Sequence, residues 1–433
     1  MLVFCSKITP RLEYVFRFVF ERALGLTVDF TTTLDVFIAH TGPKMSYGKT
    51  PLGNEFFIYA SSFLFEQGVQ PVNITPVPWN EKICFFKAEP PSFLPFDIFS
   101  SVFLCISRYE EYLPHLNDEF GRFLASQSLV VQHNQHETPL VDYWIKELYQ
   151  KLNEYYPELT IDLKPKKETR LLIDVVRPYK YLYNSFVVGV IQWVKSILQL
   201  NLWEVVEHLM VLFGLRKDPW DTFDVFKHYF KGSPLRIQFF FLYSSVSYHD
   251  RAISYLDPRF QSKIKEVADY FKVSLLASFS AQSNGKKLRD EREKLNQLIH
   301  RDVDSVRYAW GVSTVGETYQ PLVAQEVRND FSLAYPDLIG YRASTAIPYL
   351  FYDLANEMTT ELTVYPVVAN EDSLRKLTPI DAIKKLRQLY SKIPMSTGVH
   401  CFALTNKIIE KSVSNAAYRS AFISYLKRHE EQI

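Results

Sequence analysis

From Arg170 onward, short apolar runs alternate with segments whose apolar residues recur at helical spacing. The runs hold four to eight residues each and lie at 171–176, 235–242, 273–279, 306–310, 331–334, 362–368 and 399–404. The helical segments lie near 259–271, 284–300, 316–328, 378–392 and 407–428. Apolar runs of this length that are separated by helices are typical of buried parallel strands. We therefore expect an α/β fold, and the spacing fits a distorted or incomplete (β/α) barrel better than a doubly wound open sheet, which it also permits.

The first part of the chain mixes helical and strand patterns. We expect helices at 11–24, 96–113 and 139–155, and strands at 26–30 and 55–59. A connector that contains prolines and several lysines follows at 157–169. We place the domain boundary there, with a smaller α/β N-terminal domain at 1–160 and the barrel domain at 161–433. The length of 433 residues also favours two domains over one.

The most apolar stretch lies at 186–215, inside the second domain. Lys195, Glu204, Glu207 and His208 interrupt it, so it contains no uncharged span long enough to cross a membrane. We expect a helical insertion at about 184–232, built of amphipathic helices that pack on the protein. Attachment to a membrane surface through 186–215 is the less favoured alternative.

The charge balance and the cysteines limit the expected partners and location. The chain carries 49 Lys plus Arg against 48 Asp plus Glu, a net charge of +1, which gives no general attraction to nucleic acid. Its four cysteines are scattered and form no CxxC pair, so neither a zinc knuckle nor a disulfide framework is expected. The first residues lack the pattern of a signal peptide. We expect a cytoplasmic protein, with a place at the periphery of the inner membrane as the alternative.

Asp174 is the first candidate for chemistry, because it stands near the end of the apolar run at 171–176. β/α enzymes place catalytic groups at the carboxyl ends of buried strands. One carboxylate can serve as a general base, but it cannot hold a metal alone. The motifs GxSxG, GxxxxGK[ST], GxGxxG and HExxH are all missing from the sequence.

Several longer motifs resemble, in order and over nearly the whole chain, a mostly Bacteroidetes-type family of polysaccharide deacetylase-like proteins. They are SRYEEY at 107–112, DEFGRF at 118–123, PLVDYW at 139–144, DPWDTFD at 218–224, FFFL at 239–242, HDR at 249–251, GYRAS at 340–344 and PYLFYDL at 348–354. The resemblance implies a NodB-type barrel behind a family-specific N-terminal domain. It also implies removal of acetyl groups from a polysaccharide, with a divalent metal such as zinc activating the water.

The resemblance further implies where the base and the metal ligands would stand. The base position is Asp174, and the metal-binding carboxylate of the same motif is replaced by Val176. The three histidine positions are occupied by Leu276, Ala309 and Thr405. Valine, leucine and alanine side chains have no lone pairs to offer a metal, and threonine is a poor neutral ligand. We therefore predict that the metal site is lost and that no cofactor remains.

Other polar and aromatic residues at the expected barrel mouth are candidates for substrate binding: Arg307, Trp310, Tyr341 and Arg342. For Asp174 we favour a structural ion pair with a neighbouring cation, such as Arg177 or Arg342, over a surviving base. For the aromatic residues, packing is the default because aromatics are abundant in this chain.

The sequence thus predicts a catalytically inactive member of the polysaccharide deacetylase-like proteins. It would act as a carbohydrate- or partner-binding module in bacterial envelope polysaccharide metabolism, with a polysaccharide or an envelope-biosynthesis protein as its partner and no nucleic acid. Two alternatives stay open. One is an active carbohydrate N- or O-deacetylase that uses Asp174 in an unusual site, and the other is a membrane-surface scaffold that attaches through 186–215.

Overall fold

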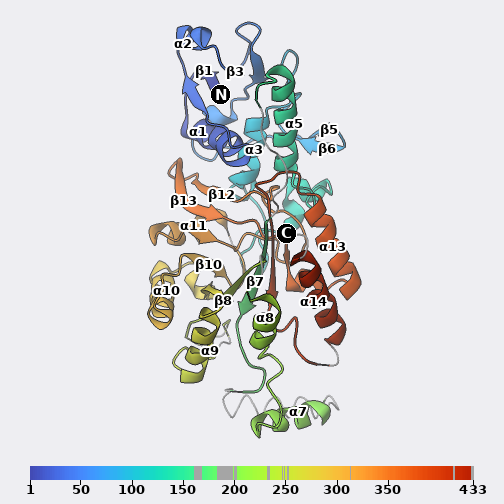
Figure 1. The fold of residues 1–433 in the computed structure, drawn as a ribbon. Helices are drawn as coiled ribbons and strands as arrows, with labels where there is room; N and C mark the ends of the chain where they lie inside the picture. The colour runs from blue at the N-terminus through green and yellow to red at the C-terminus, as the bar shows by residue number, and fades with distance from the viewer. Residues whose placement is uncertain are drawn as a thin grey trace. The chain divides into compact units, whose positions relative to one another are not determined.

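The computed structural model describes residues 1–159, 168–182, 198, 202–231, 235–245, 247, 249–250, 253–312, 314–412 and 415–430 (Figure 1). The chain divides into two compact units. Unit 1 consists of Met1–Thr169, Gly311–Ser373 and Lys385–Cys401, and unit 2 consists of Arg170–Trp310, Leu374–Lys384 and Phe402–Ile433. The domain boundary near residue 160 stays a prediction, because these units are defined by contacts and each combines separate stretches of sequence.

Unit 1 contains a four-stranded parallel sheet in the order β2-β1-β3-β4. Its strands are β1 (Leu2–Cys5), β2 (Asp29–Thr31), β3 (Lys44–Gly48) and β4 (Phe56–Tyr59). The helices of this part are α1 (Pro10–Arg17), α2 (Leu34–Ala39), α3 (Ile98–Ile106), α4 (Leu129–Gln132) and α5 (Leu140–Tyr155). The inward side chains of the sheet are fully buried, which makes it the core of the N-terminal part.

Two of the predicted helices differ from the observed ones in a way that has local causes. The helix expected at 11–24 begins as α1, where the Thr9 side chain accepts the N–H of Leu12, and continues as a π-helix at Phe18–Ala23. The helix expected at 96–113 ends with α3, because Arg108 has φ of +54° and breaks the helical path. A short 3₁₀ turn, Tyr109–Glu111, follows.

The remaining part of unit 1 holds two antiparallel hairpins. The first joins β5 (Val77–Trp79) to β6 (Lys82–Cys84), and the second joins β12 (Tyr349–Asp353) to β13 (Met358–Val364). Strand β11 (Asn329–Asp330) pairs in parallel with β13, and α11 (Val315–Ala324) precedes it. The short β14 (Ala369–Asn370) and α12 (Glu371–Leu374) follow. The sequence did not predict β12.

Unit 2 contains parallel strands in the order β10-β9-β8-β7, with β15 (Val399–Thr405) beside β7. They are β7 (Glu168–Val175), β8 (Arg236–Phe241), β9 (Lys272–Ala277) and β10 (Ser305–Tyr308). Consecutive residues of β7, from Leu171 to Ile173, have no exposed surface, so both faces of this sheet are covered. The predicted α/β fold is confirmed. Within the described residues, the strand pairings do not close into a ring.

Most helices of unit 2 follow the predicted pattern, but the last one begins at Ala416 rather than at the predicted residue 407. The helices are α7 (Leu202–Leu212), α8 (Phe223–Phe230), α9 (Pro258–Ala268), α10 (Gly285–Ile299) and α14 (Ala416–Glu430), while α13 (Pro379–Ser391) belongs to both units. Helices α7 and α8 lie within the predicted insertion at 184–232, most of whose first part lies outside the described residues. Among the helices that the structure describes, none is long and apolar enough to cross a bilayer.

Candidate functional site

The carboxyl ends of the unit 2 strands bring Asp174 of β7 together with Arg307 of β10. The Nε atom of Arg307 donates to both carboxylate oxygens of Asp174, at 3.0 Å to Oδ1 and 2.9 Å to Oδ2. The side chains are 17% and 8% exposed for Asp174 and Arg307 respectively. Asp174 therefore does form an ion pair, but its cation is Arg307, a residue that the sequence had marked for substrate binding. Arg342, which had been named as a possible partner, binds Glu111 instead.

The distance between the strands of this ion pair also indicates the shape of the sheet. Strands β8 and β9 lie between β7 and β10, so three inter-strand spacings separate the paired residues. In a flat sheet that separation would be roughly 14 Å, more than an aspartate and an arginine joined through Nε can bridge. The sheet must therefore curve, with Asp174 and Arg307 on its concave side.

The four positions that the sequence analysis predicted for metal ligands are occupied by poor donors. The register pairs Leu276 with Arg307, and Leu276 is fully buried. Ala309 continues the ladder beyond β10, because its N–H donates to the carbonyl of Ala277 at 3.0 Å. Val176 directly follows β7, and Thr405 ends β15. This set of side chains does not fit a divalent metal, and the described residues contain no cluster of three His, Cys, Asp or Glu that could hold one.

A buried carboxylate, Asp250, organises aromatic rings at the same strand ends. It accepts hydrogen bonds from the backbone N–H of Phe279 at 3.1 Å, from the hydroxyl of Ser247 at 3.1 Å and from Nε1 of Trp310 at 3.4 Å. The rings of His249, Phe279 and Trp310 gather around it, with centroids 4.4 to 6.0 Å apart. The sequence showed Asp250 only as part of the HDR motif at 249–251 and gave it no role.

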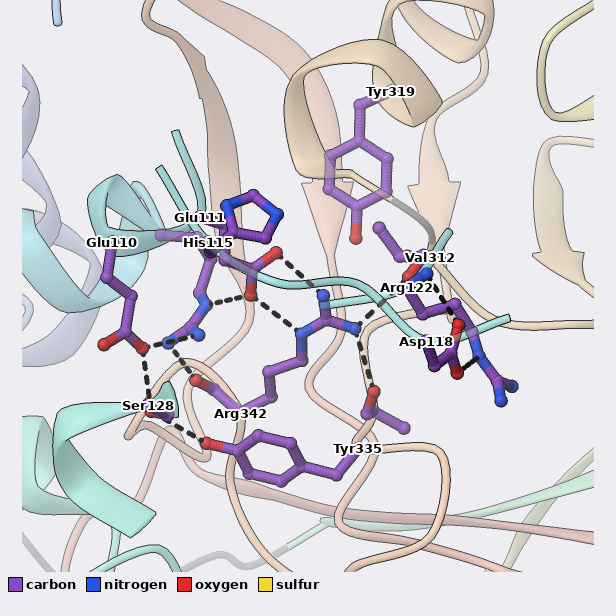
Figure 2. Close-up of polar contacts among 12 residues, drawn as sticks. Glu110, Glu111, His115, Asp118, Arg122, Ser128, Val312, Tyr319, Tyr335 and Arg342 are labelled. Carbon is purple, nitrogen blue, oxygen red and sulfur yellow. Dashed lines mark hydrogen bonds and ion pairs between the residues drawn. The ribbon is translucent and has the colours of Figure 1, made fainter. Parts of the chain in front are cut away.

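Arg342 lies in unit 1, in a buried ionic network that Figure 2 shows. Its Nε and Nη2 atoms bind the two oxygens of Glu111 at 2.8 and 2.7 Å. Arg108 binds Glu111 from another side, with Nε 2.8 Å from Oε1, and also donates to the backbone carbonyl of Arg342. All three side chains are buried. Burial alone would raise the pKa of Glu111, but Arg342 and Arg108 hold that pKa below its ordinary value.

Protein groups supply further partners around this network. Nη1 of Arg342 donates to the carbonyl of Ala334 at 3.1 Å, and Arg108 also binds Glu110 at 2.7 Å. Glu110 in turn accepts from the hydroxyl of Ser128 at 2.8 Å. Tyr341 is likewise buried, and its hydroxyl donates to the carbonyl of Leu389 at 3.3 Å. In unit 2 the structure thus places Arg307 against Asp174, and Trp310 against Asp250. In unit 1 it places Arg342 and Tyr341 in the interior. The roles of these residues toward a substrate stay predictions.

Parts of this chain are similar to a family model and to a solved structure. A model of a family of unknown function, DUF7033, matches residues 1–157, which include Arg108 and Glu111 but not Asp174. No curated protein sequence matches the chain. A solved structure from Mycobacterium smegmatis, provisionally called a polysaccharide deacetylase, aligns with a TM-score of 0.37 and 13% identity, over 62% of this chain and 89% of that one.

Proposed function

We propose that this chain is a polysaccharide deacetylase-like protein that has lost metal-dependent catalysis and binds a carbohydrate, or a protein partner, in bacterial envelope polysaccharide metabolism. The observation that carries the proposal is the ion pair in which Arg307 engages both oxygens of Asp174. A general base must present a carboxylate oxygen to its substrate. Here the Nε–H of Arg307, a cation of the chain itself, is shared between both oxygens, as in a structural ion pair.

A barrel-type arrangement of unit 2 is part of this proposal. The curvature that the Asp174–Arg307 pair requires supports it, as does the order of four adjacent parallel strands. The motifs at 107–112, 218–224 and 340–344, which resemble the deacetylase-like proteins, support the same assignment.

A carbohydrate ligand agrees with the aromatic rings at the strand ends. His249 is exposed, and Phe279 and Trp310 are partly exposed. Flat aromatic faces stack on the apolar faces of sugar rings, and the Trp310 indole is held by the hydrogen bond from its Nε1 to the carboxylate of Asp250. Arg307 lies at the same strand ends and would add hydrogen bonds to a ligand hydroxyl or carboxylate.

Isothermal titration with an oligomer of N-acetylglucosamine tests the binding role. We expect the full chain to bind, and Trp310→Ala to weaken binding roughly threefold to tenfold through the lost stacking. Trp79→Ala, a partly exposed tryptophan of the β5–β6 hairpin in unit 1, is the matched control and should bind as the wild type does. Equal binding by the Trp310→Ala variant, or no binding by the wild type, would refute this ligand class.

An acetate-release assay separates this proposal from an active deacetylase that uses Asp174. The partial exposure of the Asp174 side chain is the observation that favours that alternative. We expect no acetate from the acetylated oligomer, with or without added zinc, cobalt or nickel, because the ligand positions hold Val176, Leu276, Ala309 and Thr405. Release that disappears in Asp174→Ala would establish the alternative.

A further inference from the structure

We propose that helix α7 binds a lipid surface through its outward apolar face. The face is defined by Trp203, Val206, Leu209, Leu212 and Phe213, all exposed; Trp203 is 58% exposed and Phe213 is 76% exposed. In Figure 1, α7 lies beyond α8 and α9, at the edge of the drawing. Large apolar side chains gathered on one exposed face mark an interaction site rather than ordinary surface.

The helix is amphipathic in the inverted sense. Successive residues step by about 100° around the axis, which places the five apolar residues on one half of the circumference and Glu204, Glu207 and His208 on the other. Glu207, His208 and Val211 are buried. The polar half therefore faces the protein and the apolar half faces solvent, against the usual rule for a surface helix.

Polar contacts fix this orientation. Glu207 accepts a hydrogen bond from the Tyr181 hydroxyl at 3.0 Å and pairs with Arg216 at 3.0 Å. Glu204 pairs with Lys180 at 3.0 Å, and the His208 ring stacks on Tyr181 at 4.5 Å. Rolling the helix to bury its apolar face would break these contacts, so the outward face is built into unit 2.

The end of the helix extends the same face. Gly214 has φ of +71°, and the N–H of Leu215 donates to the carbonyl of Met210 at 2.8 Å, as in a glycine C-cap. This cap brings Leu215, which is also exposed, next to the last apolar turn.

The size of the face favours a lipid surface over a second copy of the chain. Eleven residues give a helix about 16 Å long and about 10 Å wide, so one face offers a few hundred Å² at most. A stable protein interface needs about 800 Å² from each partner. An interfacial helix needs no such area, because each apolar side chain that enters the acyl boundary adds to binding, and tryptophan favours that depth.

Co-sedimentation of the full chain with phosphatidylcholine vesicles tests the proposal. We expect the wild type to sediment with the vesicles and the double variant Leu209→Glu/Phe213→Glu to lose at least about tenfold in partition coefficient, equal to about 1.4 kcal/mol. Ile380→Glu replaces another exposed apolar residue, 79% exposed on α13, and should bind as the wild type does. A blue shift of tryptophan emission on vesicles, lost in Trp203→Phe, should accompany binding.

Three outcomes would overturn the proposal. The first is a wild type that stays in the supernatant, and the second is a double variant that binds as well as the wild type does. The third is a wild type that light scattering shows to be a dimer and that the double variant turns into a monomer, which would assign the face to a second copy. Circular dichroism confirms that each variant is folded. Oligosaccharide binding is measured with the same samples and should be equal in the wild type and the double variant, because no residue of α7 lies among the aromatic rings at the strand ends. This measurement distinguishes a failure of lipid binding from a failure of the proposed carbohydrate binding.

Discussion

Replacing Glu111 with glutamine tests whether the buried network of unit 1 holds the fold together. The Glu111 carboxylate accepts two hydrogen bonds from Arg342 and one from Arg108, and all three side chains are buried. Glutamine keeps one oxygen but turns an amide N–H₂ toward guanidinium donors. Arg342 then loses its only carboxylate among the ion pairs of the described residues, while Arg108 keeps Glu110.

Removing one partner of a buried ion pair typically destabilises a protein by about 3–5 kcal/mol, since the remaining charge stays buried. With a urea slope of about 3 kcal/mol/M, the midpoint of unfolding should fall by about 1–2 M. The assay is urea unfolding followed by tryptophan fluorescence. The control is Arg17→Ala, which removes exposed i,i+4 pairs with Glu13 and Glu21 and should change stability by less than about 0.5 kcal/mol.

A double variant gives a sharper result. Because Arg342 is the cation left behind, Glu111→Gln combined with Arg342→Met should be less destabilising than the sum of the two single changes. The reasoning is refuted if Glu111→Gln moves the midpoint no more than Arg17→Ala does, or if the two changes add.

Two further predictions concern other charged groups. Arg307→Met should destabilise unit 2 by about 1–3 kcal/mol in thermal unfolding, because Asp174 keeps its charge near buried strands without the cation. The control is Arg259→Met, which replaces an exposed arginine on α9. An unchanged unfolding temperature in Arg307→Met would show that the ion pair is dispensable. Burial raises the pKa of Asp142 to about 7, even though the Thr345 hydroxyl and the Ala346 N–H donate to it. Because this pKa lies above the unfolded value of 3.8, the contribution of Asp142 to the free energy of unfolding is full below about pH 4 and is lost as the pH rises to about 7. Asp142→Asn should remove this part of the pH dependence in urea unfolding. A variant with the same pH profile as the wild type would contradict the prediction.

The local pattern of the sequence was sufficient for most of unit 2. Runs such as 171–176 and 235–242 became β7 and β8, because a strand buried on both faces needs a continuous apolar run. The strand β12 was missed because its five residues, which follow Pro348, alternate less clearly. The early end of α3 at Ile106 could not be predicted, since the backbone of Arg108 turns where its side chain reaches Glu111 and Arg342.

The sequence by itself determined that the expected ligand positions offer poor metal donors, because the capacity to donate to a metal belongs to the side chain itself. These positions hold Val176, Leu276, Ala309 and Thr405. Only the tertiary structure decided which charges meet. Arg307 reaches Asp174 across two strands because the sheet curves, and Arg342 meets Glu111 across 231 positions of sequence. The periodicity of α7 likewise shows two faces, but not which one points inward. Its contacts with Tyr181 and Arg216 turn the apolar face outward, and such long-range pairings leave no trace in the local pattern.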